Sequence, residues 1–199
     1  MAVVPKMASL SLGEESGSSA SSERELLRRA GLRQEQAVRE LYRLHVGRVH
    51  RTVVRVLGRT DPDVEDVVQQ VFMAALDGAE GFDGRSSVGS WLLGIATRRA
   101  LDEARRRWRR GRWSSVTALV GLGRPSSRPD HHVGARDEAL EALSVLSPDQ
   151  RAVFVLHEVE GYTLAEIREM TGTGISTLHA RLFAARKKLD QASHAAEAS

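Results

Sequence analysis

The sequence predicts an all-α fold, with two small helical domains joined by a flexible linker. Apolar residues recur at steps of three and four along most of the chain, which is the spacing of one helix face. No segment shows the alternation of apolar and polar residues that indicates a strand. Aromatic residues make up only 5% of the 199 residues, a low share that argues against a β-sandwich.

The first helical pattern follows a serine-rich segment. Residues 1–22 contain seven serines and few apolar residues, so residues 1–33 are expected to be a disordered leader. From about Gln34 the apolar side chains take helical spacing, and Gly58 is placed to end that helix. This apolar face consists of Val38, Leu41, Tyr42, His45, Val49, Val53 and Val56.

The second helical pattern has one apolar and one polar face. Asp61-Pro62 supplies an N-cap and a proline at the first helical position. The apolar face consists of Val64, Val67, Val68, Val71, Phe72, Ala75 and Leu76. The opposite face carries a strip at helical spacing, made of Asp63, Asp66, Gln69, Gln70 and Met73.

Four glycines and several serines interrupt the helical pattern between residues 77 and 90. A further helix starts near Ser90 and runs into the arginine-rich segment 105–110. Residues 113–136 lack clear periodicity and are expected to form the linker. The domains are therefore expected at residues 34–112 and 137–192, followed by a tail at residues 193–199.

The C-terminal domain contains clear helix start and stop residues. Ser147 with Gln150, and Thr163 with Glu166, have the spacing of capping boxes. A helix at 164–171, a turn at Gly172–Gly174 and a helix at 176–190 predict a helix-turn-helix. Its shared core is expected to contain Leu164, Ile167, Ile175, Leu178 and Leu182.

Charges are strongly segregated although the net charge is only +3. Residues 60–83 carry seven acids and no Lys or Arg, whereas residues 98–112 carry eight arginines against two acids. In the C-terminal domain, residues 137–170 hold eight acids and two arginines, whereas residues 175–189 hold four cations and no acid. This separation suggests one basic partner and one polyanionic partner, although solvated helix faces remain the simpler alternative.

The second helix of the helix-turn-helix has the composition of a DNA-recognition helix. Its start exposes short polar residues and its later turns carry cations, which suit base edges and phosphates of a major groove. An ordinary helical hairpin with a basic surface is the alternative. Phe82 and Trp91 border the glycine-rich loop, where they either grip unstacked bases or belong to the core.

No catalytic, metal-binding or cofactor-binding constellation is present. The chain contains no cysteine, which excludes disulfides, cysteine-based zinc sites and thiol catalysis. His131-His132 has no third ligand nearby, and neither a nucleophile motif nor a phosphate-binding glycine loop occurs. No apolar run approaches the roughly 18 residues that cross a bilayer. We therefore expect a cytoplasmic protein that is not an enzyme, needs no cofactor and does not insert into a membrane.

Three segments carry a family resemblance: DVEDVVQQVFMAAL, FDGRSSVGSWLLGIATRRALDEARRR and LSPDQRAVFVLHEVEGYTLAEIREMTGTGISTLHARLFAARKKL. They closely resemble bacterial RNA polymerase sigma factors of the sigma-70 family, extracytoplasmic function (ECF) group. The match covers about residues 35–110 and 137–190, in the order and spacing of the family. It implies a σ2-like module of three or four helices followed by a σ4-like helix-turn-helix module.

The resemblance also implies partners and site residues. Core RNA polymerase, through the clamp helices of its β′ subunit and through its β subunit, would bind Asp63, Asp66, Gln69, Gln70 and Met73. The −10 element of promoter DNA would contact Phe82, Arg85, Ser86, Ser87, Trp91, Arg98, Arg105 and Arg106. The −35 element would contact Ser176, Thr177, His179, Ala180, Arg181, Arg186 and Lys187.

By this resemblance the protein recruits core polymerase, recognises and melts a promoter, and initiates transcription under the control of an anti-sigma factor. A helix-turn-helix regulator that acts without core polymerase is the alternative, and it leaves the acidic strip unexplained. The family often has asparagine at Arg98, larger residues at Gly89 and Gly94, and Arg-Ser in place of His179-Ala180.

Overall fold

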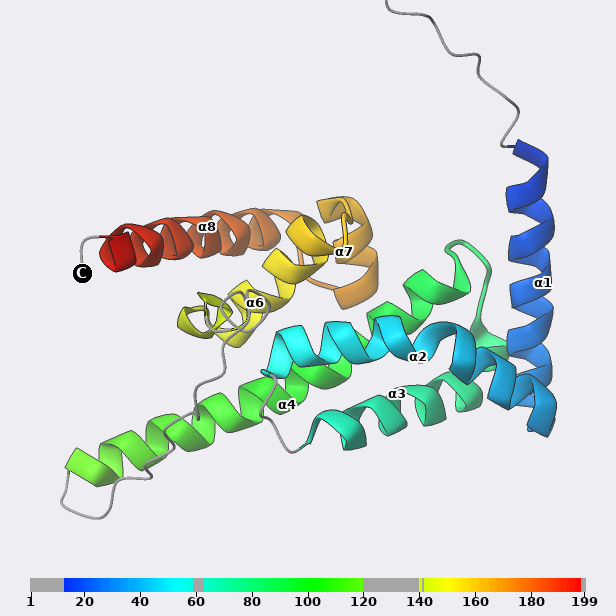
Figure 1. Cartoon of the computed structure of the whole chain (residues 1–199), viewed down its shortest axis with the longest axis horizontal. Coiled ribbons are helices and arrows are strands. Elements are labelled where there is room, and N and C mark those ends of the chain that lie inside the picture. Colours follow the sequence, from blue (N-terminus) through cyan, green and yellow to red (C-terminus); the bar gives the residue numbers. More distant parts are fainter. Residues whose placement is uncertain (1–12, 59–62, 120–139, 141, 198–199) are drawn as a thin grey trace, which may run out of the picture.

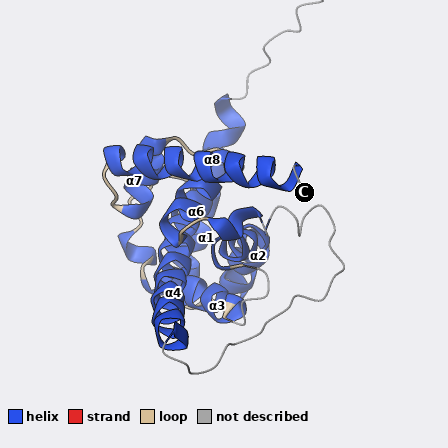
Figure 2. Cartoon of the chain, turned by 90° about the vertical axis from the view of Figure 1, so that its left-hand side faces the viewer, coloured by secondary structure: helices blue, strands red, loops and turns tan. Residues whose placement is uncertain are grey.

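Figure 1 shows the computed structural model of the chain, which describes residues 13–58, 63–119, 140 and 142–197. Within these residues all regular structure is helical and no strand occurs, as Figure 2 shows. The prediction of an all-α fold is therefore confirmed for the described part of the chain. The elements are α1 (Gly13–Gly31), α2 (Glu35–Leu57), α3 (Val64–Asp77), η1 (Ala79–Gly81), α4 (Val88–Leu119), η2 (Leu143–Val145), α6 (Pro148–Phe154), η3 (Val155–Val159), α7 (Leu164–Thr171) and α8 (Ile175–Glu197).

Helices α1 to α4 form what we call the N-terminal module. Helices α2, α3 and α4 lie side by side, and α1 crosses their end (Figure 1). Each helix buries most of the apolar face that its spacing predicts, and Val53, Val71 and Leu92 are 0% exposed. Tyr42, predicted on the apolar face of α2, is instead 47% exposed. Fully burying one such side chain contributes about 1.5–3 kcal/mol, so these faces hold the three long helices together.

Helix α1 lies where a disordered leader was expected. Its residues Leu27 and Ala30 are fully buried against the core of the module. At its end, a Cβ on Gly31 would stand 2.6 Å from the Cβ of Ala79, so the glycine allows the close approach of η1. Serine content suggested disorder for residues 1–33, but apolar spacing gives the last turns of α1 a face to bury. Residues 1–12 lie outside the described part.

Helix α3 begins later than expected. Asp61-Pro62 was predicted to cap and open this helix, but Val64 is its first residue and Asp63 is its N-cap. The Asp63 side chain makes no capping hydrogen bond and instead forms an ion pair with Arg107 of α4. The predicted start is therefore wrong, and Asp61-Pro62 itself lies outside the described residues.

Helices α4 and α8 both extend beyond their expected ends. Helix α4 continues to Leu119, so the first residues of the expected linker, 113–119, are helical. The remainder of that linker, 120–136, lies outside the described residues. Helix α8 continues to Glu197 and takes in most of the expected tail at 193–199.

The elements from η2 to α8 form the C-terminal module, a helix-turn-helix preceded by α6 and a π-helical turn, η3. Both predicted capping boxes are confirmed: Ser147 Oγ accepts from the Gln150 backbone N–H, and Thr163 Oγ1 accepts from that of Glu166. Gly172 ends α7 in the left-handed conformation at φ 69°, which favours glycine. Leu178 is fully buried as predicted, but Ile175, expected in the core, is 40% exposed.

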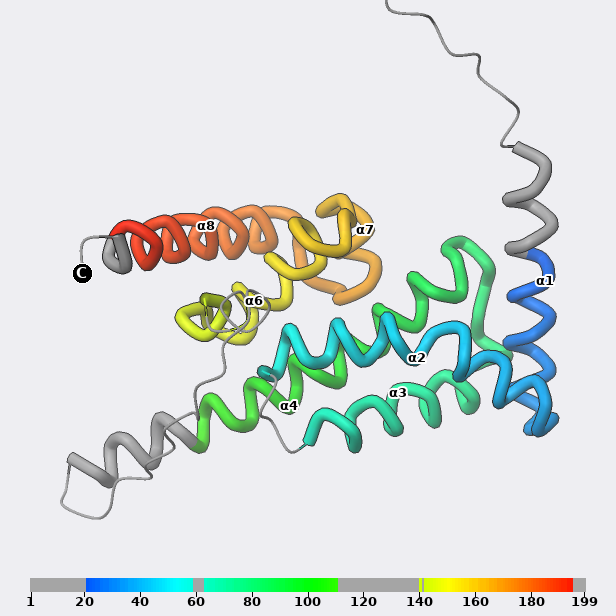
Figure 3. Tube along the Cα trace, in the orientation of Figure 1, coloured from blue at the N-terminus to red at the C-terminus, as the bar shows by residue number. Residues whose placement is uncertain are grey.

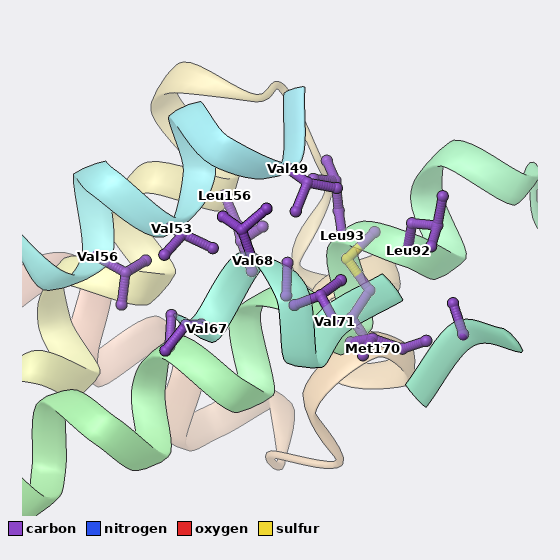
Figure 4. Close-up of a cluster of buried hydrophobic side chains, with 14 of the residues drawn as sticks. Val49, Val53, Val56, Val67, Val68, Val71, Leu92, Leu93, Leu156 and Met170 are labelled. Atoms are coloured by element: carbon purple, nitrogen blue, oxygen red, sulfur yellow. The ribbon is translucent and has the colours of Figure 1, made fainter. Parts of the chain in front are cut away.

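The two modules pack directly against each other. Figure 3 traces α6 and α7 back towards the N-terminal module, where α6 contacts α2 and α4 and α7 contacts α4. Leu156 and Met170 of the C-terminal module belong to the same buried cluster as Val53 and Leu93 of the N-terminal module. Figure 4 shows these side chains converging. One hydrophobic core is therefore shared by both modules, and a second, smaller cluster within the C-terminal module contains Leu143, Leu146, Val155 and Ala185.

Candidate polymerase-docking and promoter-binding surfaces

The polar strip predicted on α3 faces solvent. Asp66, Gln69, Gln70 and Met73 are all exposed, and Met73 is 53% exposed despite its apolar side chain. The opposite face is buried in the core of the N-terminal module. One face of the helix is thus buried in the core and the other is exposed to solvent. An exposed methionine beside acidic and amide side chains is typical of a docking surface.

Asp63, the first residue of the predicted strip, is engaged within the module. Its carboxylate accepts a hydrogen bond from Arg107, and this bond is the main cause that lowers the pKa of Asp63. Arg107 also lies 3.5 Å from Glu103 of its own helix. These bonds join the start of α3 to α4, so Asp63 has a structural role in addition to its predicted one.

The loop before α4 combines a buried aromatic residue with exposed polar ones. Phe82 is 7% exposed and packs against Trp91 with ring centroids 5.3 Å apart. Of the two alternatives, the structure therefore assigns Phe82 to the core, where it supports the half-buried Trp91. Arg85 and Ser86 are exposed, and Ser87 Oγ accepts a hydrogen bond of 3.1 Å from the Ser90 backbone N–H.

The arginines of α4 that were predicted to contact the −10 element point in different directions. Arg98 donates to the backbone carbonyl of Met170 in α7. Arg105 forms an ion pair of 2.6 Å with Asp149 of α6, and this hydrogen bond is the main cause that raises the pKa of Arg105. Arg106 instead pairs with Glu103 of its own helix at 3.2 Å.

The start of α8 presents the short residues predicted to read DNA. Ser176, Thr177, His179 and Ala180 are all exposed. Two of the predicted phosphate contacts are partnered within the C-terminal module. Arg181 pairs with Asp149 at 2.8 Å and Arg186 pairs with Glu158 at 2.5 Å. Lys187 is exposed on the following turn.

Glu160 is a central residue that the sequence did not reveal. Its carboxylate lies 2.7 Å from Arg55 and 3.2 Å from Arg48, both on α2, although its side chain is only 8% exposed. Thr52 donates to the same carboxylate at 3.3 Å. Tyr162 also accepts from Arg48 at 3.1 Å. A buried carboxylate with two cations is well compensated, so Glu160 fixes the C-terminal module to α2.

The described residues offer no site for metal chemistry. Among them, no group of three or more His, Cys, Asp or Glu side chains could hold a metal ion. Within the same ranges, no helix is long and apolar enough to cross a bilayer.

Comparison with protein families places both modules. The chain matches Sigma-70 region 2 over residues 41–110 and Sigma-70 region 4 over residues 136–189. These ranges contain the α3 strip, the loop before α4, the arginines of α4 and the helix-turn-helix. Helix α1 lies outside both matches.

Individual relatives agree with these matches. The chain is 30% identical over 150 residues to the ECF RNA polymerase sigma factor SigM of Mycobacterium tuberculosis, an alignment that covers 75% of this chain and 74% of the relative. In fold it resembles CnrH in complex with the cytosolic domain of CnrY, with a TM-score of 0.58, 24% identity and coverage of 87% and 97%. It also resembles RpoE of Bartonella quintana in complex with the anti-sigma factor NepR, with a TM-score of 0.56, 22% identity and coverage of 77% and 94%. The chain therefore belongs to the sigma-70 family as an ECF RNA polymerase sigma factor, a non-enzymatic subunit that directs the polymerase to its promoters.

Proposed function

We propose that this sigma factor divides its task among three surfaces, each of which meets a different partner. The α3 strip docks on core polymerase, the loop before α4 and the α4 arginines engage the −10 element, and the start of α8 reads the −35 element. The observation that carries the assignment is the exposure of an acidic strip on one module and of a recognition-type helix start on the other.

Docking on core polymerase uses Asp66, Gln69, Gln70 and Met73, with Asp63 at the edge. Acids and amides around one exposed apolar side chain match a basic helical partner, and the clamp helices of the β′ subunit are that partner in our proposal. The β subunit provides further contacts. Complementary charge steers such an encounter and fixes its register.

Melting at the −10 element is driven by binding energy. Arg85, Ser86 and Ser87 line the loop that receives an unstacked base, while Phe82 supports Trp91 from inside the core. Arg98, Arg105 and Arg106 supply cations for the phosphates. Unstacking a base costs a few kcal/mol, and stacking and phosphate contacts offset that cost.

Recognition at the −35 element uses the major groove. Residues at the N-terminal end of a recognition helix meet base edges, and Ser176, Thr177, His179 and Ala180 occupy that place. Arg181, Arg186 and Lys187 meet phosphates, which carry most of the salt-dependent affinity.

The same proposal implies where the protein works in the cell and what regulates it. A subunit of RNA polymerase works in the cytoplasm of a bacterial cell. An anti-sigma factor is its proposed regulator, because such a protein accompanies the Bartonella quintana relative of similar fold. Co-purification from the native cell would identify this partner.

The direct test combines the purified chain with core polymerase and a library of promoter fragments. The proposal expects binding to core polymerase and initiation from a defined subset of fragments. Core polymerase without the chain is the control. Tight binding to duplex DNA, with neither core binding nor initiation, would instead identify a regulator that acts without polymerase.

A further inference from the structure

Helix α1 reaches the loop that the proposed function assigns to the −10 element, although the helix lies outside both family matches. It contacts η1 on one side of this loop and α4 on the other, and the loop passes beside it in Figure 1. Arg24 is the residue of α1 whose side chain lies on the loop itself. The matched region 2 therefore does not contain every residue at this surface.

The guanidinium of Arg24 occupies the space that a side chain at Gly84 would fill. A Cβ on Gly84 would stand 2.7 Å from Nη1 and 3.0 Å from Cζ of Arg24. Such a Cβ would overlap the guanidinium, so the glycine allows Arg24 to lie directly on the loop backbone. The next residues of the loop, Arg85 and Ser86, are those proposed to receive an unstacked base. Arg24 thus brings a cation from another helix to that place.

Arg24 differs from its neighbouring arginines because it has no partner. Three arginines line a cavity of about 730 Å³ between α1, the end of α3 and η1. Two of them are neutralised: Arg28 pairs with Glu25 at 2.7 Å, and Arg33 pairs with Asp77. No hydrogen bond or ion pair joins Arg24 to another described residue. Its charge is therefore available to an anion from outside the chain.

The arginine of the loop itself is already engaged. The Asp83 carboxylate accepts from the backbone N–H of Arg85 at 3.0 Å and from its Nε at 2.5 Å, and the backbone bond is the main cause that lowers the pKa of Asp83. Glu80, the remaining acid of the cavity, is exposed and forms no ion pair with Arg24. Arg24 therefore supplies a cation at this loop that no carboxylate holds.

We propose that Arg24 binds a backbone phosphate of the single DNA strand, beside the base that the loop receives, so that α1 is part of the −10 surface. The proposal rests on the proposed function. A strand whose base enters the loop carries a phosphate on each side of that nucleotide. Proteins that bind single strands combine contacts to the bases with cations along the backbone, and a guanidinium can bind one phosphate through two parallel hydrogen bonds.

A phosphate contact has a recognisable energetic signature. It positions the strand and adds affinity without reading the base. On single-stranded DNA, each neutralised phosphate steepens the fall of log affinity with log salt concentration by about 0.7. Arg24 should therefore affect the salt dependence of strand binding, whereas a residue with only a structural role should not.

The experiment measures how the full chain in complex with core polymerase binds a −10 fork oligonucleotide at several salt concentrations. Arg24→Ala should weaken binding by about three- to tenfold and make the salt slope shallower by about 0.7. Arg168→Ala is the matched control, because it removes the same charge at an exposed residue of α7 and the fork contains no −35 element. It should leave both quantities unchanged. Thermal melts should be alike for all three proteins, since neither arginine is buried.

Forks with one neutral phosphate identify the contact itself. A methylphosphonate replaces, in turn, each of the two phosphates that flank the received base. For the unaltered chain, one of these replacements should cost about three- to tenfold in affinity. For Arg24→Ala the same replacement should cost almost nothing, because the partner of that phosphate is already gone.

The possible outcomes separate this contact from the proposed function. Unchanged affinity in Arg24→Ala, a loss of affinity with an unchanged salt slope, or equal methylphosphonate effects in both proteins would each overturn the Arg24 contact and leave the proposed function standing. If the unaltered chain with core polymerase does not bind the fork, the proposed function itself has failed.

Discussion

The acidic strip on α3 and the arginines of α4 belong to the same module, yet they are presented in opposite ways. Asp66, Gln69 and Met73 face solvent, whereas Arg98 and Arg105 are bonded to the C-terminal module. The surface assigned to protein is therefore free, and part of the surface assigned to DNA is covered.

This difference has a consequence for each proposed interaction. Docking of the α3 strip on core polymerase would not require the modules to part. Among the described residues, none of its four exposed side chains forms a hydrogen bond or ion pair with the C-terminal module. Contact of Arg98 and Arg105 with the −10 element, as proposed, would instead require their bonds to the C-terminal module to break.

Reversing charge on the free surface should have the largest effect. Asp66→Arg with Gln69→Arg places two cations where a basic partner docks, and charge reversals at an interface cost a few kcal/mol. Core binding should weaken by about 100-fold or more, as fluorescence anisotropy would measure. Gln36→Arg with Glu40→Arg, at exposed positions of α2, is the matched control. Unchanged core binding in the first variant would refute the docking assignment.

Two residues of the loop before α4 have different proposed roles: Phe82 stabilises the fold, whereas Arg85 contacts DNA. Phe82→Ala removes a nearly buried ring that packs on Trp91, and should lower the free energy of unfolding by about 3 kcal/mol. Arg85→Ala changes an exposed side chain and should stay within about 0.5 kcal/mol. Urea unfolding measures both. A stable Phe82→Ala protein would mean that the ring is not part of the core.

Local signals explain what the sequence predicted well. The capping boxes of Ser147 and Thr163 and the glycine at 172 act within a few residues, so their spacing alone indicated α6, α7 and the turn before α8. Period-3.6 apolar faces likewise placed α2, α3 and α4. Helix α1 was missed because its apolar stripe is short and follows a serine-rich stretch.

Long-range pairs explain what the sequence could not show. Arg105 and Asp149 are 44 residues apart, and Arg48 and Glu160 are 112 apart. Nothing in the spacing of these residues indicates that they meet, because the meeting depends on how one module sits on the other. The −10 residues could be proposed from motifs, but the bonds of Arg98 and Arg105 to the C-terminal module could not be predicted.

Loss of one helix cap should have a moderate effect, confined to the C-terminal module. Thr163 Oγ1 accepts from the Glu166 backbone N–H at 3.3 Å, and removal of such a cap costs about 1 kcal/mol. Thr163→Ala should therefore lower stability by that amount, measured by urea unfolding. Thr163→Ser keeps a hydroxyl at the cap and should recover most of the loss; equal losses in both would show that the cap does not contribute.

The smallest predicted effect is a pH dependence of the stability of the N-terminal module. His45 is 9% exposed, and burial is the main cause that lowers its pKa below the ordinary value of 6.5, with Glu23 opposing and Arg48 adding to the shift. The unfolded chain then takes up the proton first, so stability should fall as pH drops below about 6.5. His45→Gln should flatten this slope in thermal melts. An identical slope in the His45 variant would contradict the assignment.

The distance between the two modules tests most directly the contrast between the exposed α3 strip and the covered arginines of α4. Spin labels at Glu40→Cys and Ala165→Cys, both exposed in a chain without native cysteine, report the separation of α2 and α7 by pulsed electron paramagnetic resonance. We predict one short distance for the free protein and a clearly longer one in the complex with core polymerase and promoter DNA. The same short distance in that complex would contradict the account.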